Sequence, residues 1–206
     1  MKMKIKWFIP CLAFVLVLIM YAAKQSEGTV EVTGGSAGGI VVTLTEPDRS
    51  LLEEGDGLRK ARKFDEAVVS YERVLANKMA AVEIKKEAQY NIGLCKIERG
   101  NYDDAVTLYS GMLNTYANDG DATAHIHYCL AWIEVQREQF DSAIARLERT
   151  LEEKKCTDRE LCAKMQFMIG RIYLMFKIDY EKAKAVFKEI NNKYPETKIS
   201  QHPYLQ

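Results

Sequence analysis

The side chains that most often carry out chemistry are scarce in this chain of 206 residues, which holds three histidines and five cysteines. His125 and His127 are two positions apart in a helical pattern, so they point in different directions and cannot chelate one metal ion from a regular helix. His202 lies near the C-terminus. The sequence contains no glycine-rich phosphate loop, metalloprotease helix motif or nucleophile elbow. We therefore expect a protein that is not an enzyme and uses no metal or cofactor; only His125 and the cysteines keep a catalytic interpretation open.

Four of the cysteines lie in the expected helical region, where their spacing favours structural roles. Cys95 and Cys129 fall in helices at positions where small apolar residues normally pack, so buried thiols are expected. Cys156 and Cys162 flank a loop, and in an oxidising compartment a disulfide between them would staple that loop to the next helix. A metal site built on this pair would need a second pair with ligand spacing, which the sequence lacks.

The charged residues argue against several classes of partner. The 29 basic and 29 acidic side chains give a formal net charge of zero, so no overall field would hold a nucleic acid or steer an ionic substrate. The carboxylates alternate with Lys and Arg, which is typical of solvated helix faces rather than of an acid–base pair. We therefore expect neither a nucleic acid nor a small-molecule substrate as a partner.

Residues 1–24 form a distinct N-terminal segment. Three lysines precede an apolar run over residues 7–23, and about 17 residues is the lower limit for a helix that crosses a bilayer. Signal peptidase requires small residues one and three positions before the cut, and cleavage after Ala23 would place Tyr21 at the outer position. We therefore expect an uncleaved signal-anchor that spans the membrane once. The alternative is a cleaved signal peptide and a soluble exported protein.

The lysines before the apolar run predict the orientation of the anchor. They should stay in the cytoplasm, which places the rest of the chain outside it, in the periplasm of a bacterium. In a eukaryote, the same anchor could instead hold the protein in the mitochondrial outer membrane with the rest facing the cytosol. The next segment, residues 25–46, is a β-prone linker in which two short runs flank the glycine-rich residues 34–39. Either a hairpin or a flexible spacer fits this pattern.

An internal repeat occupies residues 47–198 and is the strongest pattern in the sequence. Each of four copies contains an aromatic residue followed three positions later by an alanine. The repeat alanines are Ala67, Ala105, Ala143 and Ala183. Each is preceded, by 12 or 13 positions, by a small residue, which is Gly55, Gly93, Ala131 or Gly170. Residues three and four apart share a helix face, and small residues let two helices approach closely. The repeat therefore predicts four helix pairs.

This pattern resembles the tetratricopeptide repeat (TPR) family, whose units have a small residue in the first helix, an aromatic at the turn and an alanine in the second helix. Residues 91–93, 100–105 and 194–195 match it best. The period exceeds the family's usual length of about 34 residues, and it is similar to that of TPR proteins of bacterial cell envelopes. The resemblance implies an all-α fold, a right-handed α-solenoid with repeats at roughly 47–79, 80–117, 120–155 and 158–196, followed by a tail over 199–206.

The resemblance also implies a protein-binding groove on the side formed by the first helices. The positions carried over are Tyr90, Asn91, Leu94, Tyr128, Trp132, Phe167 and Arg171. Their aromatic side chains would suit a peptide with apolar anchors, although they could equally pack between neighbouring first helices. Family members that grip a C-terminal carboxylate do so with a set of Lys, Asn and Arg, and only Asn91 matches that set.

Together these patterns predict a membrane-anchored scaffold that binds a protein or peptide partner outside the cytoplasm. The alternative is a structural or assembly subunit of an envelope complex whose groove has no ligand. A resemblance at the level of the fold does not identify the partner.

Overall fold

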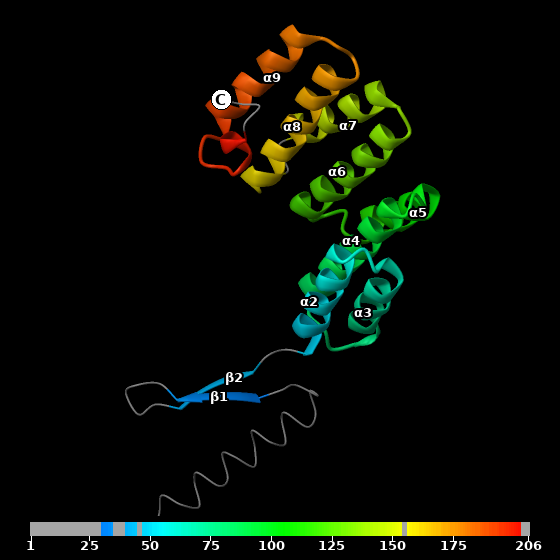
Figure 1. Cartoon of the computed structure of the whole chain (residues 1–206), viewed down its shortest axis with the longest axis vertical. Helices are drawn as coiled ribbons and strands as arrows, with labels where there is room; N and C mark the ends of the chain where they lie inside the picture. Colours follow the sequence, from blue (N-terminus) through cyan, green and yellow to red (C-terminus); the bar gives the residue numbers. More distant parts are fainter. Residues whose placement is uncertain (1–29, 35–39, 45–46, 154–155, 203–206) are drawn as a thin grey trace, which may run out of the picture. The chain divides into compact units, whose positions relative to one another are not determined.

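The computed structural model describes residues 30–34, 40–44, 47–153 and 156–202. Within these ranges the chain forms two β-strands, eight α-helices and a short 3-10 helix (Figure 1). The expected signal-anchor at residues 1–24 lies outside the described residues. Among the helices that are described, none combines the length and the apolar character needed to cross a bilayer.

The two strands form an antiparallel hairpin. β1 (Val30–Gly34) pairs with β2 (Ile40–Leu44), with Val30 opposite Leu44 and Gly34 opposite Ile40. Of the two alternatives that the β-prone linker left open, the backbone of these two runs adopts the hairpin.

The helices follow one another as four pairs. They are α2 (Pro47–Lys60) with α3 (Phe64–Ala76), α4 (Val82–Glu98) with α5 (Tyr102–Thr115), α6 (Gly120–Gln136) with α7 (Phe140–Glu152), and α8 (Arg159–Met175) with α9 (Tyr180–Lys193). The 3-10 helix η1 (Ile199–Gln201) follows α9. These eight helices confirm the all-α repeat array for the part of the chain from residue 47 onwards that the structure describes.

Each pair closes through a turn that contains one residue in the left-handed region. These residues are Arg62, Gly100, Glu138 and Ile178, with φ of 61°, 81°, 60° and 53°. In the first three turns, a backbone N–H bonds to the carbonyl five residues earlier, as in Gln139 to Glu134. In the fourth turn the N–H of Asp179 donates to the carbonyl of Tyr173, which is six residues earlier. The extra residue of the fourth repeat is therefore accommodated in this turn.

Small residues of the first helices lie against large residues of the second helices. A Cβ atom added to the glycine would come within 2.4 Å of a ring carbon in three pairs: Gly55 against Tyr71, Gly93 against Tyr109, and Gly170 against Phe187. In the α6–α7 pair, Ala131 and Leu147 take these places, and both are fully buried. The first helix of this pair thus has alanine where the other pairs have glycine. Its second helix has leucine where the others have an aromatic residue.

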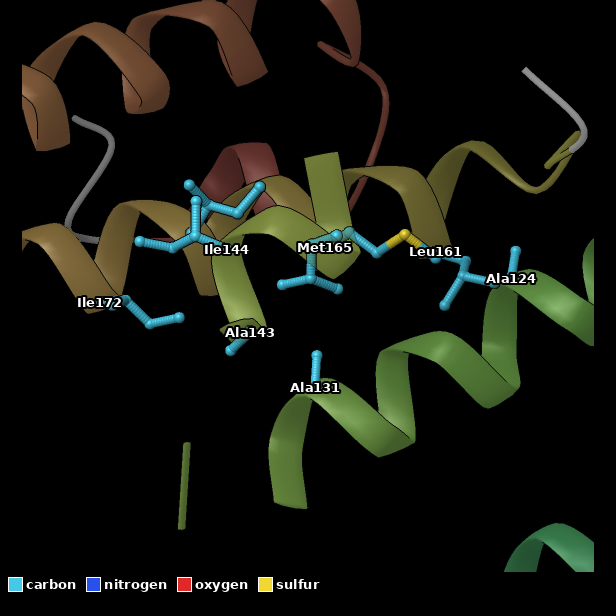
Figure 2. Packing of buried hydrophobic residues seen from close by; sticks show 9 residues of the cluster. Ala124, Ala131, Ala143, Ile144, Leu161, Met165 and Ile172 are labelled. Atoms are coloured by element: carbon cyan, nitrogen blue, oxygen red, sulfur yellow. The ribbon is translucent and has the colours of Figure 1, made fainter. Parts of the chain in front are cut away.

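The described residues divide into two compact units, one up to residue 92 and the other from residue 93 onwards, and the boundary falls within α4. In the second unit, the helices from α6 to α9 lie side by side in sequence order (Figure 1). Side chains of α6, α7 and α8 face one another in its main core (Figure 2). This core contains Ala124, Ala131, Ala143, Ile144, Leu147, Leu161, Met165, Ile169 and Ile172. A smaller cluster joins α8 to α9 through Ala163, Ala183, Phe187 and Ile190.

Acidic residues in the first turns of helices link neighbouring repeats of the second unit. Two of them form ion pairs with bases about one repeat further on, at 2.6 Å between Asp103 and Arg137 and 2.5 Å between Asp141 and Lys177. A third, Asp121 of α6, accepts hydrogen bonds from the backbone N–H groups at 157 and 158, just before α8. These contacts help to set α8 beside α6.

Candidate functional site

A groove of about 390 Å³ lies in the second unit and is formed mainly by α6 and α8. These are the first helices of the third and fourth pairs, and they contact each other. The lining residues are Tyr128, Trp132, Val135 and Gln136 from α6, Lys164, Phe167, Met168, Arg171 and Ile172 from α8, Phe176 after α8, and Ile199 of η1.

Helical spacing explains why these residues share one surface. Tyr128, Trp132 and Val135 follow each other by four and three positions, so they form one row on α6. Phe167 and Arg171 form an equivalent row on α8. The two rows line a groove whose walls are mostly apolar, with a few polar groups, as is usual for ligand sites.

The aromatic residues of the groove are held by packing on their inner sides. Tyr128 packs against the main core and is half-buried, and this burial is the main cause that raises the pKa of its hydroxyl. The ring of Phe167 lies 5.7 Å from that of Phe187 and 4.7 Å from the imidazole of His202. At the other end, the ring of Phe176 stacks on Phe140 with centroids 4.5 Å apart. These contacts support the rings of Tyr128, Phe167 and Phe176 from the inner side of the groove.

The charged residues that line the groove are both cations. Lys164 and Arg171 are exposed, and none of the described lining residues is acidic. The guanidinium of Arg171 has Met175 Sδ as a weak partner at 3.8 Å. Lys164 also influences His125: burial is the larger cause that lowers the pKa of this histidine, and the positive charge of Lys164 is the next. The groove therefore offers positive charge beside apolar surface.

The structure brings together four of the seven residues predicted for the groove, namely Tyr128, Trp132, Phe167 and Arg171. The other three are not among its lining residues. Tyr90 is buried and belongs to the first unit. Asn91 of the same unit donates a hydrogen bond of 3.0 Å to Asp56 Oδ1. Leu94 is half-buried in the second unit.

Sequence reasoning missed several lining residues. Lys164 lies three positions before Phe167, Met168 lies three before Arg171, and Ile172 lies four after Met168, so the helical period could have found them. No periodic signal could have found Ile199, because it reaches the groove only when the chain returns after α9. The same return brings His202 against Phe167.

A polar cluster lies on α6 and α7, apart from the groove. Arg146 of α7 binds Glu134 of α6 through two nitrogens, with Nη2 at 2.7 Å from Oε1. Ser142 also donates to Glu134, at 3.0 Å, and Arg146 Nη1 lies 3.4 Å from His127 Nδ1. Burial and then the charge of Arg146 lower the pKa of His127. The serine thus contacts the carboxylate rather than the histidine, and the cluster shows no activated nucleophile.

The cysteines of the helical region are free thiols, and none of them belongs to a metal site among the described residues. Cys95 and Cys129 are buried as expected, and burial raises the pKa of Cys129 to about 12. Cys156 and Cys162 are free thiols, with Cys162 Sγ at 3.9 Å from the Cys156 carbonyl oxygen. Burial, followed by the neighbouring Cys162, raises the pKa of Cys156. Across the described ranges, no three His, Cys, Asp or Glu side chains are grouped so that they could hold a metal ion.

Comparison with known proteins identifies the repeats. Residues 87–152 and residues 165–197 each match a family model described as a tetratricopeptide repeat. No curated protein matches the sequence.

The solved structures with a similar fold include the following two. One is the Rap conjugation gene regulator of the plasmid pLS20 in complex with the Phr* peptide, with a TM-score of 0.60 and 15% identity over 72% of this chain and 43% of that one. This chain therefore spans less than half the length of the regulator. The other is a protein of Podosopora anserina described as a kinesin light chain with nearly identical TPR-like repeats. It has a TM-score of 0.55 and 20% identity over 78% of this chain and 82% of that one.

Proposed function

Because the chain belongs to the tetratricopeptide repeat family, we propose that it is a membrane-anchored scaffold that binds a protein or peptide partner in the groove between α6 and α8. Proteins of this family mediate interactions with proteins or peptides, and their fold is typically a non-catalytic scaffold. The similar Rap regulator is itself bound to a peptide.

The observation that carries the proposal is the partial exposure of three aromatic side chains in one groove. Tyr128, Trp132 and Phe167 are each half-buried, while smaller aliphatic side chains fill the main core between α6, α7 and α8. The aromatic rings therefore both pack against the helices and leave surface open to a ligand. Rigid aromatic side chains of this kind dominate the energy of protein interfaces.

Affinity capture by the full-length protein in its native membrane tests the groove. We expect Trp132→Ala and Tyr128→Ala each to reduce recovery of the partner about tenfold or more, since truncated aromatic hot spots often cost over 1.4 kcal/mol of binding. Tyr180→Ala is the matched control, because Tyr180 is a 62%-exposed aromatic residue of the same unit that does not line the groove. Circular dichroism verifies that each variant is folded. Undiminished recovery by both groove variants would refute the assignment.

The anchor is the second part of the proposal and is supported by the sequence of residues 1–24. We propose that this segment remains uncleaved and spans the membrane, with the repeats outside the cytoplasm. Intact-mass analysis of the purified protein should find Met1 or the residue after it at the N-terminus. A mature chain that begins after Ala23 would indicate the alternative, a soluble exported protein.

The Cys156 and Cys162 thiols provide a test of the compartment. If the repeats face an oxidising space, thiol–disulfide exchange with a disulfide oxidant should join the two sulfurs, which transfers two electrons and two protons to the oxidant. Mass spectrometry of protein alkylated in intact cells should then find this pair bridged and lighter by two hydrogen atoms. Alkylation of both thiols would place the repeats in a reducing compartment.

A structural subunit without a groove ligand is the second candidate function. It is favoured by exposed apolar side chains at the α8–α9 turn, where Ile178 and Tyr180 are 65% and 62% exposed. Crosslinks to a partner that involve this turn and the second helices, but not the groove, would support this candidate.

A further inference from the structure

The charges of the groove indicate which class of partner it takes, if the proposed function holds. Both charged lining residues are cations, and the remaining lining residues are aromatic, aliphatic or uncharged polar. We propose that the groove binds an extended segment of a partner protein that carries two carboxylates, three positions apart, with apolar residues between them. Lys164 and Arg171 would each hold one carboxylate.

The availability of the two cations supports this assignment. Elsewhere in the second unit, Arg137, Arg146 and Lys177 are each paired with a carboxylate of a neighbouring helix. Lys164 and Arg171 have no carboxylate partner among the described residues, and both are exposed beside the groove. Their charges are therefore open to a ligand, whereas those of Arg137, Arg146 and Lys177 are used within the fold.

The spacing of the cations sets the spacing of the carboxylates. Lys164 and Arg171 are seven positions apart on α8, which corresponds to about 10 Å along the helix axis. In an extended polyproline II segment, three residues span about 9 Å and complete one turn, so side chains three positions apart face the same way. Acidic residues at positions i and i+3 of such a segment would match the two cations.

The apolar surface between the cations determines the residues at i+1 and i+2. Phe167 and Met168 lie between Lys164 and Arg171 on α8, and Tyr128 and Trp132 lie on the facing helix. The volume of about 390 Å³ is at the small end for ligand sites. A helical partner, about 10 Å across with its side chains, would need a wider site, so we commit to an extended segment.

Peptide selection on the full-length protein tests the inference. A randomised hexapeptide library displayed on phage is selected against the wild type, against Lys164→Gln/Arg171→Gln and against Trp132→Ala. Lys184→Gln/Lys188→Gln is the matched control, because it removes the same charge from exposed positions of α9 outside the groove. The binding of the preferred wild-type peptide, and of its counterpart with Gln in place of each acid, is then measured by fluorescence anisotropy.

The expected result is a preference for two acids three positions apart with apolar residues between them. The selected peptide should bind about fivefold more weakly to Lys164→Gln/Arg171→Gln, as two exposed ion pairs are lost, and unchanged to the control. Peptides without this acidic pair, or equal binding to the charge variant, would overturn the inference. In that case, weaker binding to Trp132→Ala would leave the proposed groove intact. Failure to select any peptide that depends on Trp132 would overturn both.

Discussion

Helix α6 packs against α8 on one side and against α7 on the other. The charged residues at these two sides differ in what they contact. Towards α8, the cations Lys164 and Arg171 stand beside exposed aromatic surface without a carboxylate partner among the described residues. Towards α7, Arg146 is held by Glu134 through two nitrogens, and their side chains are only 31% and 12% exposed. On the α7 side, the charged residues therefore pair with each other and hold two helices together. On the α8 side, the cations can pair with a ligand, which is why we place ligand binding there.

The largest expected effect comes from breaking the pair on the α7 side. Glu134→Gln should lower the free energy of unfolding by about 2 kcal/mol, because the partly buried Arg146 would lose its counter-charge. Peptide binding to the groove should be unchanged. Urea unfolding followed by circular dichroism measures the loss, with Glu148→Gln on the exposed face of α7 as the control. If both variants unfolded at the same urea concentration, the pair would contribute nothing to stability.

A second substitution tests the contribution of packing, rather than charge, to holding α8 against α9. Gly170→Ala should destabilise the protein by about 1.5 kcal/mol, because the new Cβ would lie 2.3 Å from the ring of Phe187. The control is Gly111→Ala on α5, where the added Cβ would meet no atom within 4 Å apart from its chain neighbours and the backbone of its own helix. There alanine should instead stabilise the helix, by about 0.5 kcal/mol or more. Thermal unfolding compares the stability of the two variants. An equal increase in stability in both would show that the Phe187 ring moves aside without destabilising the protein.

The two sides should also respond differently to salt. Raising the ionic strength from about 0.05 M to about 0.5 M shortens the Debye length to a few ångströms and screens exposed charges most. Binding of an acidic peptide to the groove should therefore weaken about threefold, as measured by anisotropy, while the urea midpoint should change little through the Arg146–Glu134 pair. Binding that does not respond to salt would mean that the cations take no part.

The smallest expected effect is a pH dependence of stability that arises from the two histidines of α6, His125 and His127. Burial and then Arg146 lower the pKa of His127 from its ordinary 6.5, and burial and then Lys164 do the same for His125. The unfolded chain therefore binds protons more readily, so stability is full above about pH 6.5 and falls as the pH decreases below it. His125→Gln/His127→Gln should flatten this slope in urea unfolding between about pH 7.5 and pH 5.5. An unchanged slope would mean that other titratable residues cause the pH dependence of stability.

Much of the fold could be predicted because its main contacts are between helices adjacent in sequence. The repeat alanines Ala143 and Ala183 are buried at the interfaces of their helix pairs. The glycine of the first helix also meets a large residue of the second helix, as in Gly93 with Tyr109. Even the extra residue of the fourth repeat has a counterpart in the longer α8–α9 turn.

The groove could be predicted only in part. Trp132 and Arg171 followed from their positions in the repeat, and both line the groove. The same positional rule also selected Tyr90, which is buried, and Asn91, whose amide is bound to Asp56. A position in a repeat specifies a helix face, but it does not specify whether neighbouring residues leave that face open.

The sequence by itself therefore determined the helices, their pairing and the alternation of small and large residues at each crossing, because these depend on a local period and on neighbouring segments. Tertiary structure alone decided that Glu134 neutralises Arg146, while Lys164 and Arg171 have no carboxylate partner among the residues that the structure describes. It also decided that Ile199 returns to the wall of the groove. The position of Ile199 depends on the return of the chain after α9, and the charge pairing depends on which side chains meet across the helix interfaces. The repeat pattern of the sequence does not specify these contacts.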